Sequence, residues 1–327
     1  MSEEEPVKEP EVEEPGGDEL ERALHSLRLE IRSRFPAPGR ARASIGDGEW
    51  ARLYADLRRR IATLGMSERS GEVDEFGMDE LVVDRARPIL DLLFDRWFRV
   101  DLAGVAQLPE RGPALLVANH SGLLPWDGLM LSRGIERLHA GRRRPRFLVA
   151  DWLITLPFVQ PYLARLGGVR ACRENAERLL ASGHLVVAFP EGVKGAAKVF
   201  RDRYRVKRFG RGGVVRVALE TGVPLVPVGI VGAEEAHPLL FKWTTPARSL
   251  GLPFLPVTPT FPLLGPLGGV PLPTKWVIRI GAPIPLDQLA PDADSDELLV
   301  SRLTEELRSQ VQSLVDVALA ERESVWG

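Results

Sequence analysis

The chain of 327 residues has only one cysteine, Cys172. A single thiol cannot form an intramolecular disulfide or supply the several sulfur ligands of a structural zinc site, so both kinds of scaffold are excluded. No uninterrupted run of about 20 apolar residues occurs, so we expect no membrane-spanning helix. The N-terminus is acidic and has no basic stretch leading into an apolar run, so we expect no secretory signal.

Basic residues are scarce at the start of the chain, although the whole chain is nearly neutral, with 43 Lys+Arg and 45 Asp+Glu. Residues 1–19 hold nine acidic side chains and one basic one, which leaves 42 basic against 36 acidic residues in the rest. Residues 141–216 hold 17 basic and five acidic residues. Such a field attracts phosphorylated ligands, anionic lipid or nucleic acid, and its ordinary alternative is a solvated basic face. Because no nucleic-acid-binding motif accompanies it, we expect no nucleic-acid partner.

The first third of the chain has a tail and then helical patterns. Residues 1–18 are rich in Glu and Pro and poor in apolar side chains, which predicts a disordered acidic tail. Apolar residues recur at helical spacing over 20–31, 50–61 and 78–94, the last predicted to bend near Pro88. We therefore predict an N-terminal helical region over residues 19–96.

From residue 97 short apolar runs alternate with amphipathic segments, which is typical of a layered α/β domain. The predicted strands cover residues 98–102, 114–118, 146–150, 185–189, 225–231 and 275–280. The predicted helices cover residues 127–134, 175–182, 212–221 and, at the C-terminus, 294–320. The domain is predicted to extend over 97–327, with its motifs between 97 and 285.

One apolar strand ends at Asn119 and His120, and Asp127 follows after a Gly/Pro turn, where a helix begins. A histidine at a strand end can act as a general base, and an aspartate a turn away can hydrogen-bond one ring nitrogen and stabilise the imidazolium. The plainer interpretation is a surface histidine and a helix-capping aspartate. The spacing alone leaves both interpretations open.

Two further segments are candidates. A buried strand continues into Phe189-Pro190-Glu191-Gly192, followed by Lys194, where glycine permits close approach of a ligand and lysine can meet an anion. The alternative is a strand-ending turn with a solvated lysine. Pro227 lies inside the pattern of the strand 225–231, which predicts an edge strand or a distortion near a pocket.

Together and in this order, these segments resemble the glycerolipid acyltransferase family. Asn119-His120 with Asp127 is similar to the family's His-(x4)-Asp block, and residues 168–173, 189–192 and 223–227 are similar to its next three blocks. The resemblance implies an α/β fold with a mixed central sheet flanked by helices. It implies an enzyme that moves an acyl chain from acyl-CoA or acyl-ACP to a lipid hydroxyl, without a metal, a cofactor or a covalent acyl-enzyme.

The resemblance also implies site roles, one block at a time. His120 would be the general base and Asp127 would orient it. The positions that match acceptor-binding blocks are Arg173, Phe189, Pro190, Glu191, Gly192, Lys194 and Pro227. No Gly-x-Ser-x-Gly elbow is present, which argues against a serine hydrolase.

This sequence departs from the family pattern at some positions. Six residues separate His120 from Asp127 where the family usually has four, Cys172 stands where an acidic residue is common, and Lys194 replaces the usual arginine. Three interpretations stay open: a lysophospholipid acceptor such as 1-acyl-glycerol-3-phosphate, a neutral glyceride or other lipid alcohol, and a non-catalytic module that binds lipid or acyl-CoA.

A lipid acceptor implies contact with an anionic membrane surface, so we expect a cytoplasmic protein that is peripherally associated with a membrane. The Pro-, Leu- and Phe-rich segment 238–273 is a candidate contact surface, with Phe241, Trp243, Phe254 and Phe261 as anchors. Its alternatives are a covered loop, or contact through the helical residues 78–98 instead.

Overall fold

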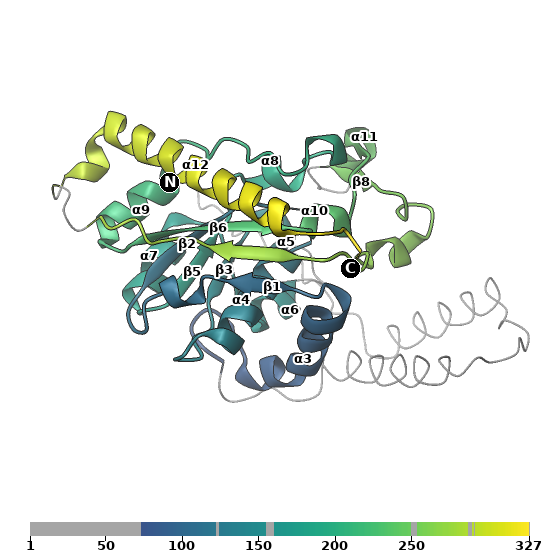
Figure 1. Cartoon of the computed structure of the whole chain (residues 1–327), viewed down its shortest axis with the longest axis horizontal. Coiled ribbons are helices and arrows are strands. Elements are labelled where there is room, and N and C mark those ends of the chain that lie inside the picture. Colours follow the sequence, from purple (N-terminus) through teal and green to yellow (C-terminus); the bar gives the residue numbers. More distant parts are fainter. Residues whose placement is uncertain are drawn as a thin grey trace, which may run out of the picture. The chain divides into compact units, whose positions relative to one another are not determined.

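The computed structural model describes residues 73–121, 124–154, 160–249, 254–286, 290 and 292–326. The predicted acidic tail and the predicted helices at 20–31 and 50–61 lie outside these residues. The centre of the fold is a seven-stranded sheet in the order β1-β9-β6-β2-β5-β3-β4 (Figure 1). Its strands are β1 (Asp101–Ala103), β2 (Ala114–Ala118), β3 (Arg146–Val149), β4 (Gly168–Arg170), β5 (Leu185–Ala188), β6 (Leu225–Val231) and β9 (Val277–Ile280).

The sheet is mixed, which confirms the expected fold class. Strands β2, β3, β4, β5 and β6 are joined by parallel pairings, β9 pairs antiparallel to β6, and β1 pairs parallel to β9. Five strands therefore end at the same edge of the sheet, where loops of α/β proteins usually bind ligands. Five strands match predicted runs, and the predicted run 98–102 overlaps β1 at Asp101 and Leu102. Strand β4 was not predicted.

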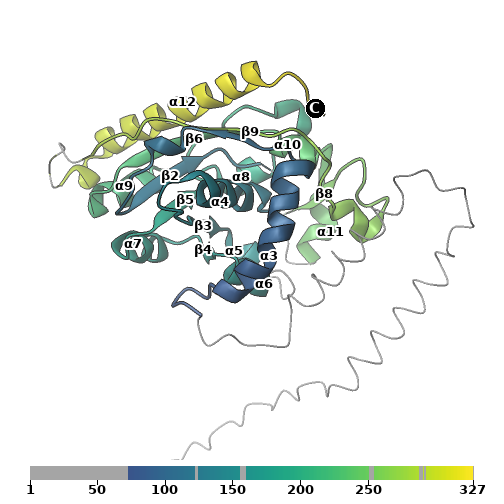
Figure 2. The same ribbon diagram turned by 60° about the horizontal axis from the view of Figure 1, so that its bottom comes forward.

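Side chains of β2 alternate between two hydrophobic cores, as the two-residue period of a strand requires. Leu116 packs with one cluster and Leu115 with the other. Helices α3 (Glu80–Leu92) and α4 (Trp126–Leu138) contribute to the first cluster. Helices α7 (Arg173–Ala181), α9 (Gly213–Thr221) and α12 (Glu297–Glu321) contribute to the second. The yellow α12 lies over β6 in both views (Figure 1, Figure 2).

Helix α3 runs through Pro88 and continues as the π-helix η1 (Leu93–Trp97). Ala86, Leu90 and Phe94 pack into the same core as β2 and α4. The predicted boundary at residue 97 therefore separates two segments that share one core. Periodicity could not show this, because it reports which face of a helix is apolar and not what that face contacts.

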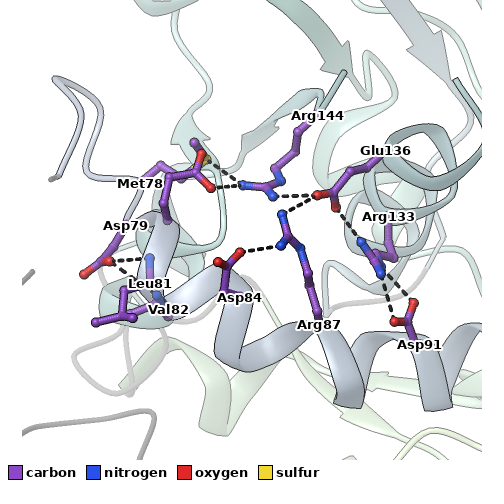
Figure 3. A network of polar contacts seen from close by, with 11 residues as sticks. Met78, Asp79, Leu81, Val82, Asp84, Arg87, Asp91, Arg133, Glu136 and Arg144 are labelled. Atoms are coloured by element: carbon purple, nitrogen blue, oxygen red, sulfur yellow. Dashed lines mark hydrogen bonds and ion pairs between the residues drawn. The ribbon is translucent and has the colours of Figure 1, made fainter. Parts of the chain in front are cut away.

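Charged side chains also hold α3 against α4 (Figure 3). Arg133 donates to both carboxylate oxygens of Asp91, at 2.9 and 2.8 Å. Glu136 accepts from Arg87 at 3.0 Å, from Arg133 at 2.8 Å and from Arg144 at 2.6 Å. Burial raises the pKa of the Glu136 carboxyl, but the guanidinium groups of Arg144 and Arg133 outweigh it and hold this pKa at about 2. The network fixes α4, whose first turn carries Asp127.

Pro227 corrects one prediction, because β6 is an interior strand and not an edge strand. β6 pairs with β2 on one side and with β9 on the other. The carbonyl of Pro227 accepts from the Gly281 N–H at 2.9 Å, just beyond the end of β9. The backbone nitrogen and carbonyl of a strand residue point to the same side. The N–H that Pro227 lacks would therefore face the β9 side, at a position where β9 has already ended.

Shorter elements complete the described residues. They are η2 (Val105–Gln107), α5 (Asp151–Ile154), α6 (Gln160–Arg165), α8 (Gly192–Ala196), η3 (Phe200–Asp202), α10 (Ala233–Ala236), β7 (Phe241–Trp243), α11 (Thr244–Ser249), β8 (Leu255–Val257), η4 (Gly265–Gly269) and η5 (Ala293–Ser295). Strands β7 and β8 form a separate two-stranded ribbon. Among the helices described here, none is both long enough and apolar enough to cross a membrane.

Candidate active site

The site is built around His120, which follows the C-terminal end of β2. Its ring nitrogen Nδ1 lies 2.7 Å from Oδ2 of Asp127 in the first turn of α4. The two residues therefore meet although six residues separate them in the chain. The side chain of Asp127 is fully buried, whereas that of His120 is 17% exposed. The histidine can thus reach a ligand while the carboxylate behind it is shielded from water.

Asp127 also accepts two backbone hydrogen bonds. Oδ2 accepts from the Ser121 N–H at 3.2 Å, and Oδ1 accepts from the Gly128 N–H at 2.8 Å. An ionised carboxylate only accepts hydrogen bonds, so Nδ1 of His120 carries the proton in this pair. The tautomer of His120 is thereby fixed, and Nε2 is the nitrogen that can take a proton from a substrate.

Glu191 holds the loop that carries His120. Its Oε1 accepts from the backbone N–H of His120 at 2.8 Å, and its Oε2 accepts from the backbone N–H of Lys207 at 2.6 Å. The ammonium of Lys198 lies 3.4 Å from Oε2. The side chain of Glu191 is fully buried. Both carboxylate oxygens thus contact the protein, which makes Glu191 a positioning residue for His120 in this geometry.

The loop after β5 packs closely against His120. The ring of Phe189 lies 4.9 Å from the imidazole, measured between ring centroids. A Cβ atom at Gly195 in α8 would come within 2.5 Å of the Glu191 Cβ and 3.1 Å of the His120 Cβ. Since real Cβ atoms are almost never under 3.0 Å from a neighbour, the contact with Glu191 requires glycine here, and the contact with His120 would be tight.

A cavity of about 380 Å³ opens beside His120; we call it cavity 1. It extends between the sheet, α7 and α9. Most of its lining is apolar, as is usual for small-ligand sites. The lining includes His120, Phe189, Pro190 and Gly192 at one end, and Leu115, Leu148, Ala150, Ala171, Cys172, Arg173, Ala176, Ala188, Phe209, Gly210, Gly213, Val214, Arg216 and Val217.

The predicted acceptor-binding residues separate into two groups. Arg173, Phe189, Pro190 and Gly192 line cavity 1 together with His120, whereas Glu191, Lys194 and Pro227 are not in its lining. Lys194 is exposed on α8, and Pro227 is buried inside the sheet.

The cations at cavity 1 already have partners. Arg173, 56% exposed, lies 2.6 Å from Glu177 and also pairs with Glu220. Arg216 lies 2.6 Å from Glu297. Exposed pairs of this kind contribute only about 0–1 kcal/mol, so a phosphate could replace the carboxylates at little cost.

The excess of positive charge predicted for residues 141–216 is reduced in the folded chain. Many of its cations pair with carboxylates from outside that stretch. These pairs are Arg144 with Glu80 and Glu136, Arg146 with Asp74, Arg178 with Glu75, Lys198 with Glu234, and Arg216 with Glu297. The count along the sequence therefore overstates the field that a ligand meets.

The acyltransferase family model matches residues 99–231, which carry His120, Asp127 and the loop after β5. An uncharacterised protein of Mycobacterium tuberculosis is 46% identical over 78% of this chain and 71% of its own length. The chain belongs to the acyltransferase family. This membership confirms the resemblance predicted from the four sequence blocks, and it makes the protein an acyltransferase enzyme.

Other proteins are also similar to this acyltransferase. An uncharacterised protein of Mycobacterium leprae is 47% identical over 78% of this chain and 70% of its own. The human "DGAT1/2-independent enzyme synthesizing storage lipids" is 27% identical over 71% of this chain and 67% of its own. The crystal structure of the 1-acyl-sn-glycerophosphate (LPA) acyltransferase PlsC from Thermotoga maritima matches with a TM-score of 0.47 and 18% identity, over 94% of this chain and 99% of that chain.

Sequence patterns did not identify all residues that build the site of this acyltransferase. Asn119 bridges β2 to β6, because its side chain donates to the Ile230 carbonyl at 2.9 Å and accepts from the Ile230 N–H at 2.7 Å. The segment before α9 is held by Glu234, which accepts from the Tyr204 N–H at 2.5 Å and lies 2.6 Å from the Lys198 ammonium. Burial raises the pKa of the Glu234 carboxyl above its ordinary value.

These contacts join residues that are far apart in the chain, so no local motif marks them. Asn119 stood in a matched block, but nothing in the sequence placed it against β6. Within the part of the chain that the structure describes, no group of three or more His, Cys, Asp or Glu side chains is arranged to hold a metal ion.

Proposed function

We propose that this acyltransferase moves a fatty acyl chain from the thioester of acyl-CoA or acyl-ACP to the hydroxyl of a lysophospholipid, of which 1-acyl-glycerol-3-phosphate is the simplest. The observation that carries the proposal is the 2.7 Å contact between His120 Nδ1 and a fully buried Asp127, at the end of cavity 1. A base with a fixed tautomer beside an apolar cavity suits proton removal from a lipid alcohol.

In the proposed reaction, Nε2 of His120 takes the proton of the acceptor hydroxyl as its oxygen attacks the thioester carbonyl carbon. The new C–O bond forms and the C–S bond then breaks, so that the sulfur leaves with the electron pair. The imidazolium returns its proton to the thiolate, which departs as a free thiol. Asp127 stabilises the imidazolium between these two steps. Since a thioester is already activated, positioning and one base are enough.

We propose that Arg173 and Arg216 receive the phosphate of the acceptor. Both line cavity 1, and both pair with carboxylates that a phosphate could displace. A bidentate contact from a guanidinium to a phosphate is stronger than a single ammonium contact. Lys194 remains a predicted contributor through its charge, because it lies on the exposed side of α8 next to this end of the cavity.

A neutral glyceride acceptor is the second candidate. Its support is the 27% identity to relatives named as enzymes synthesising storage lipids, and the six residues between His120 and Asp127. The third candidate, a non-catalytic binding module, predicted that the imidazole and the carboxylate would lie apart. The contact of 2.7 Å argues against it.

The test is thiol release by the purified full-length chain, supplied with acyl-CoA or acyl-ACP and with lysophospholipid or glyceride acceptors in micelles. We expect acceptor-dependent thiol release, which His120→Ala abolishes while the protein stays folded. Background release with every acceptor would refute the proposal, as would near-normal turnover by His120→Ala.

A matched pair of variants tests the phosphate site. Arg173→Ala should raise the KM for a phosphorylated acceptor about tenfold and leave the KM for a neutral acceptor unchanged, since one charge-assisted contact contributes about 1.5–3 kcal/mol. Arg178→Ala is the control, because Arg178 lies on the same helix, is 58% exposed and pairs with Glu75 instead. Equal effects of Arg173→Ala on both acceptors would show that Arg173 does not bind the phosphate.

For localisation, we propose peripheral association with the cytoplasmic face of a membrane, because a long-chain acceptor resides in a bilayer. Fractionation of cells that express the chain tests this, with recovery in the membrane fraction and release by detergent as the expected behaviour.

A further inference from the structure

Seven large apolar side chains are exposed close together in the chain; we call them the apolar face. They are Leu240, Phe241, Trp243, Leu263, Leu264, Leu267 and Val270, with exposed fractions from 50% to 84%. Figures 1 and 2 show this green segment, with β8 and α11, next to α10. Clusters of exposed apolar side chains on a folded protein mark interaction sites.

Of the four predicted anchors in this segment, Phe241 and Trp243 are 60% and 50% exposed. The prediction was wrong for Phe254, which is 3% exposed and packs with Ala197 and Leu239. Phe254 cannot anchor the chain to a membrane, because it closes an internal cluster. Leu263, Leu264 and Leu267, which the sequence pattern did not single out, are also exposed.

The backbone of this segment satisfies many of its own polar groups. The N–H of Leu240 donates to the Val257 carbonyl at 2.9 Å, the N–H of Thr258 to the Phe261 carbonyl at 2.8 Å, and the N–H of Leu264 to the Thr260 carbonyl at 2.8 Å. A surface can leave water only if such groups are paired. The segment is therefore built to present apolar side chains in an environment with little water.

A second cavity of about 380 Å³ lies behind the apolar face; we call it cavity 2. Its apolar lining includes Val199, Phe200, Leu239, Phe254, Leu255 and Phe261. Its polar side chains are held by other groups of the protein. Lys198 lies 2.6 Å from Glu234, and Nε2 of His237 lies 3.0 Å from the Gly269 carbonyl oxygen. The surface that a ligand would contact in cavity 2 is therefore mainly hydrocarbon.

Cavity 2 also reaches the catalytic loop. Leu124, between His120 and Asp127, is in its lining, and so is Gly195 of α8. The Gly195 position lies against the His120 side chain, since a Cβ there would be 3.1 Å from the His120 Cβ. A chain that fills cavity 2 therefore ends beside the proposed base, in a different space from cavity 1.

We propose that the apolar face lies in the interfacial layer of a lipid bilayer and that cavity 2 receives one hydrocarbon chain of a lipid from that bilayer. This inference rests on the proposed function only in taking this lipid to be the acceptor. Trp243 beside Lys242 suits the interface, where an indole sits at the headgroup level and a lysine meets anionic phosphates.

A second copy of the chain fits this surface less well than a bilayer does. Residues 240–270 contain two basic residues, Lys242 and Arg248, and no acidic residue. In a two-fold symmetric contact each face would meet its own copy, so like charges would be brought together without a counter-charge. An anionic headgroup layer supplies that counter-charge.

Vesicle flotation of the full chain tests the surface, with vesicles of phosphatidylcholine and phosphatidylglycerol. The double variant Leu263→Asp with Leu264→Asp should bind at least tenfold more weakly than the unchanged chain. Leu298→Asp is the control, because Leu298 is 79% exposed on α12, close to the 84% of Leu263. Equal binding by the double variant and the control would overturn the proposal. Loss of a dimer in light scattering, with vesicle binding unchanged, would assign the face to a second copy instead.

Gly269→Leu tests the cavity, because Gly269 lines cavity 2 and a Cβ there meets nothing within 4 Å. This variant should bind vesicles normally, lose at least tenfold in turnover of a long-chain acceptor and keep its turnover of a short-chain, water-soluble one. Unchanged turnover of the long-chain acceptor would refute the cavity assignment. If the unchanged chain turns over no acceptor, displacement of a fluorescent fatty acid by long-chain lipid reports the cavity directly. Equal displacement from Gly269→Leu and the unchanged chain would then refute the assignment independently of the proposed function.

Discussion

Asp127→Asn removes one negative charge from the proposed catalytic pair and changes little else. The carboxylate is fully buried and lies 2.7 Å from His120 Nδ1. Asparagine has the same shape and keeps an oxygen that can accept from the Ser121 or Gly128 N–H. It cannot balance the charge of an imidazolium, and its amide can present a donor to Nδ1 and select the wrong tautomer.

The expected loss follows from the electrostatics of the pair. The charges are spread over the imidazolium ring and the carboxylate, so their centres lie about 4 Å apart, where unit charges attract by about 4 kcal/mol at an effective dielectric constant of 20. That energy corresponds to roughly a 1,000-fold fall in rate. Because Asp127 lines neither cavity, the loss should appear in kcat, with KM changed less than about threefold.

Thiol release under saturating acceptor measures this loss, and thermal unfolding checks that the variant is folded. Asp151→Asn is the control, because Asp151 also follows a strand at this edge of the sheet, is 58% exposed and pairs with Arg170. It should keep kcat within about twofold, since exposed pairs contribute about 0–1 kcal/mol. A kcat for Asp127→Asn within a few-fold of the unchanged chain would refute the assigned role of the carboxylate.

Three further predictions use other parts of the structure. Gly195→Ala should lower kcat at least tenfold, because its Cβ would come within 2.5 Å of the Cβ of Glu191, which positions His120. Gly213→Ala, whose Cβ meets nothing within 4 Å, should leave kcat unchanged. Gly213→Leu should instead fill part of cavity 1 and raise the KM for a phosphorylated acceptor, as titration of the acceptor would show. Glu136→Gln should cost about 3 kcal/mol in the free energy of unfolding at pH 7. Since the folded pKa of Glu136 is about 2, below its ordinary 4.5, this cost should vanish as the pH falls from 4.5 towards 2 in denaturant titrations.

The strands and the main helices could be predicted from the sequence because their signals are local. Parallel strands buried on both faces give short continuous apolar runs, and those for β2 and β6 matched the structure residue for residue. The ribbon of β7 and β8 was missed because its residues are exposed or half-buried and show no alternation. The edge-strand prediction for Pro227 was wrong. A proline shows that a backbone N–H donor is missing, but it does not show that the neighbouring strand has already ended there.

The candidate site was predictable where the end of a strand or the start of a helix carries its own chemistry, as at His120 and Phe189 after strands and at Asp127 in the first turn of α4. The role of Glu191 was not predictable. Its partners are the backbone N–H groups of His120 and Lys207, 71 and 16 residues away, and backbone donors leave no pattern in a sequence. The count of six residues before Asp127 was similarly uninformative, because the contact depends on where α4 begins relative to β2.

The charge of residues 141–216 also depends on contacts that form only in the folded chain. A stretch of 76 residues with twelve excess positive charges seemed to offer a broad basic surface. In the folded chain Arg144, Arg146 and Lys198 lie inside ion pairs and are at most 13% exposed, so they add little to a basic surface. In the proposed function, selection of a phosphorylated acceptor therefore depends on Arg173 and Arg216 at cavity 1. If substitution of Arg173 and Arg216 left the KM for phosphorylated acceptors unchanged, the basic composition of residues 141–216 would give no reason to expect a phosphorylated acceptor.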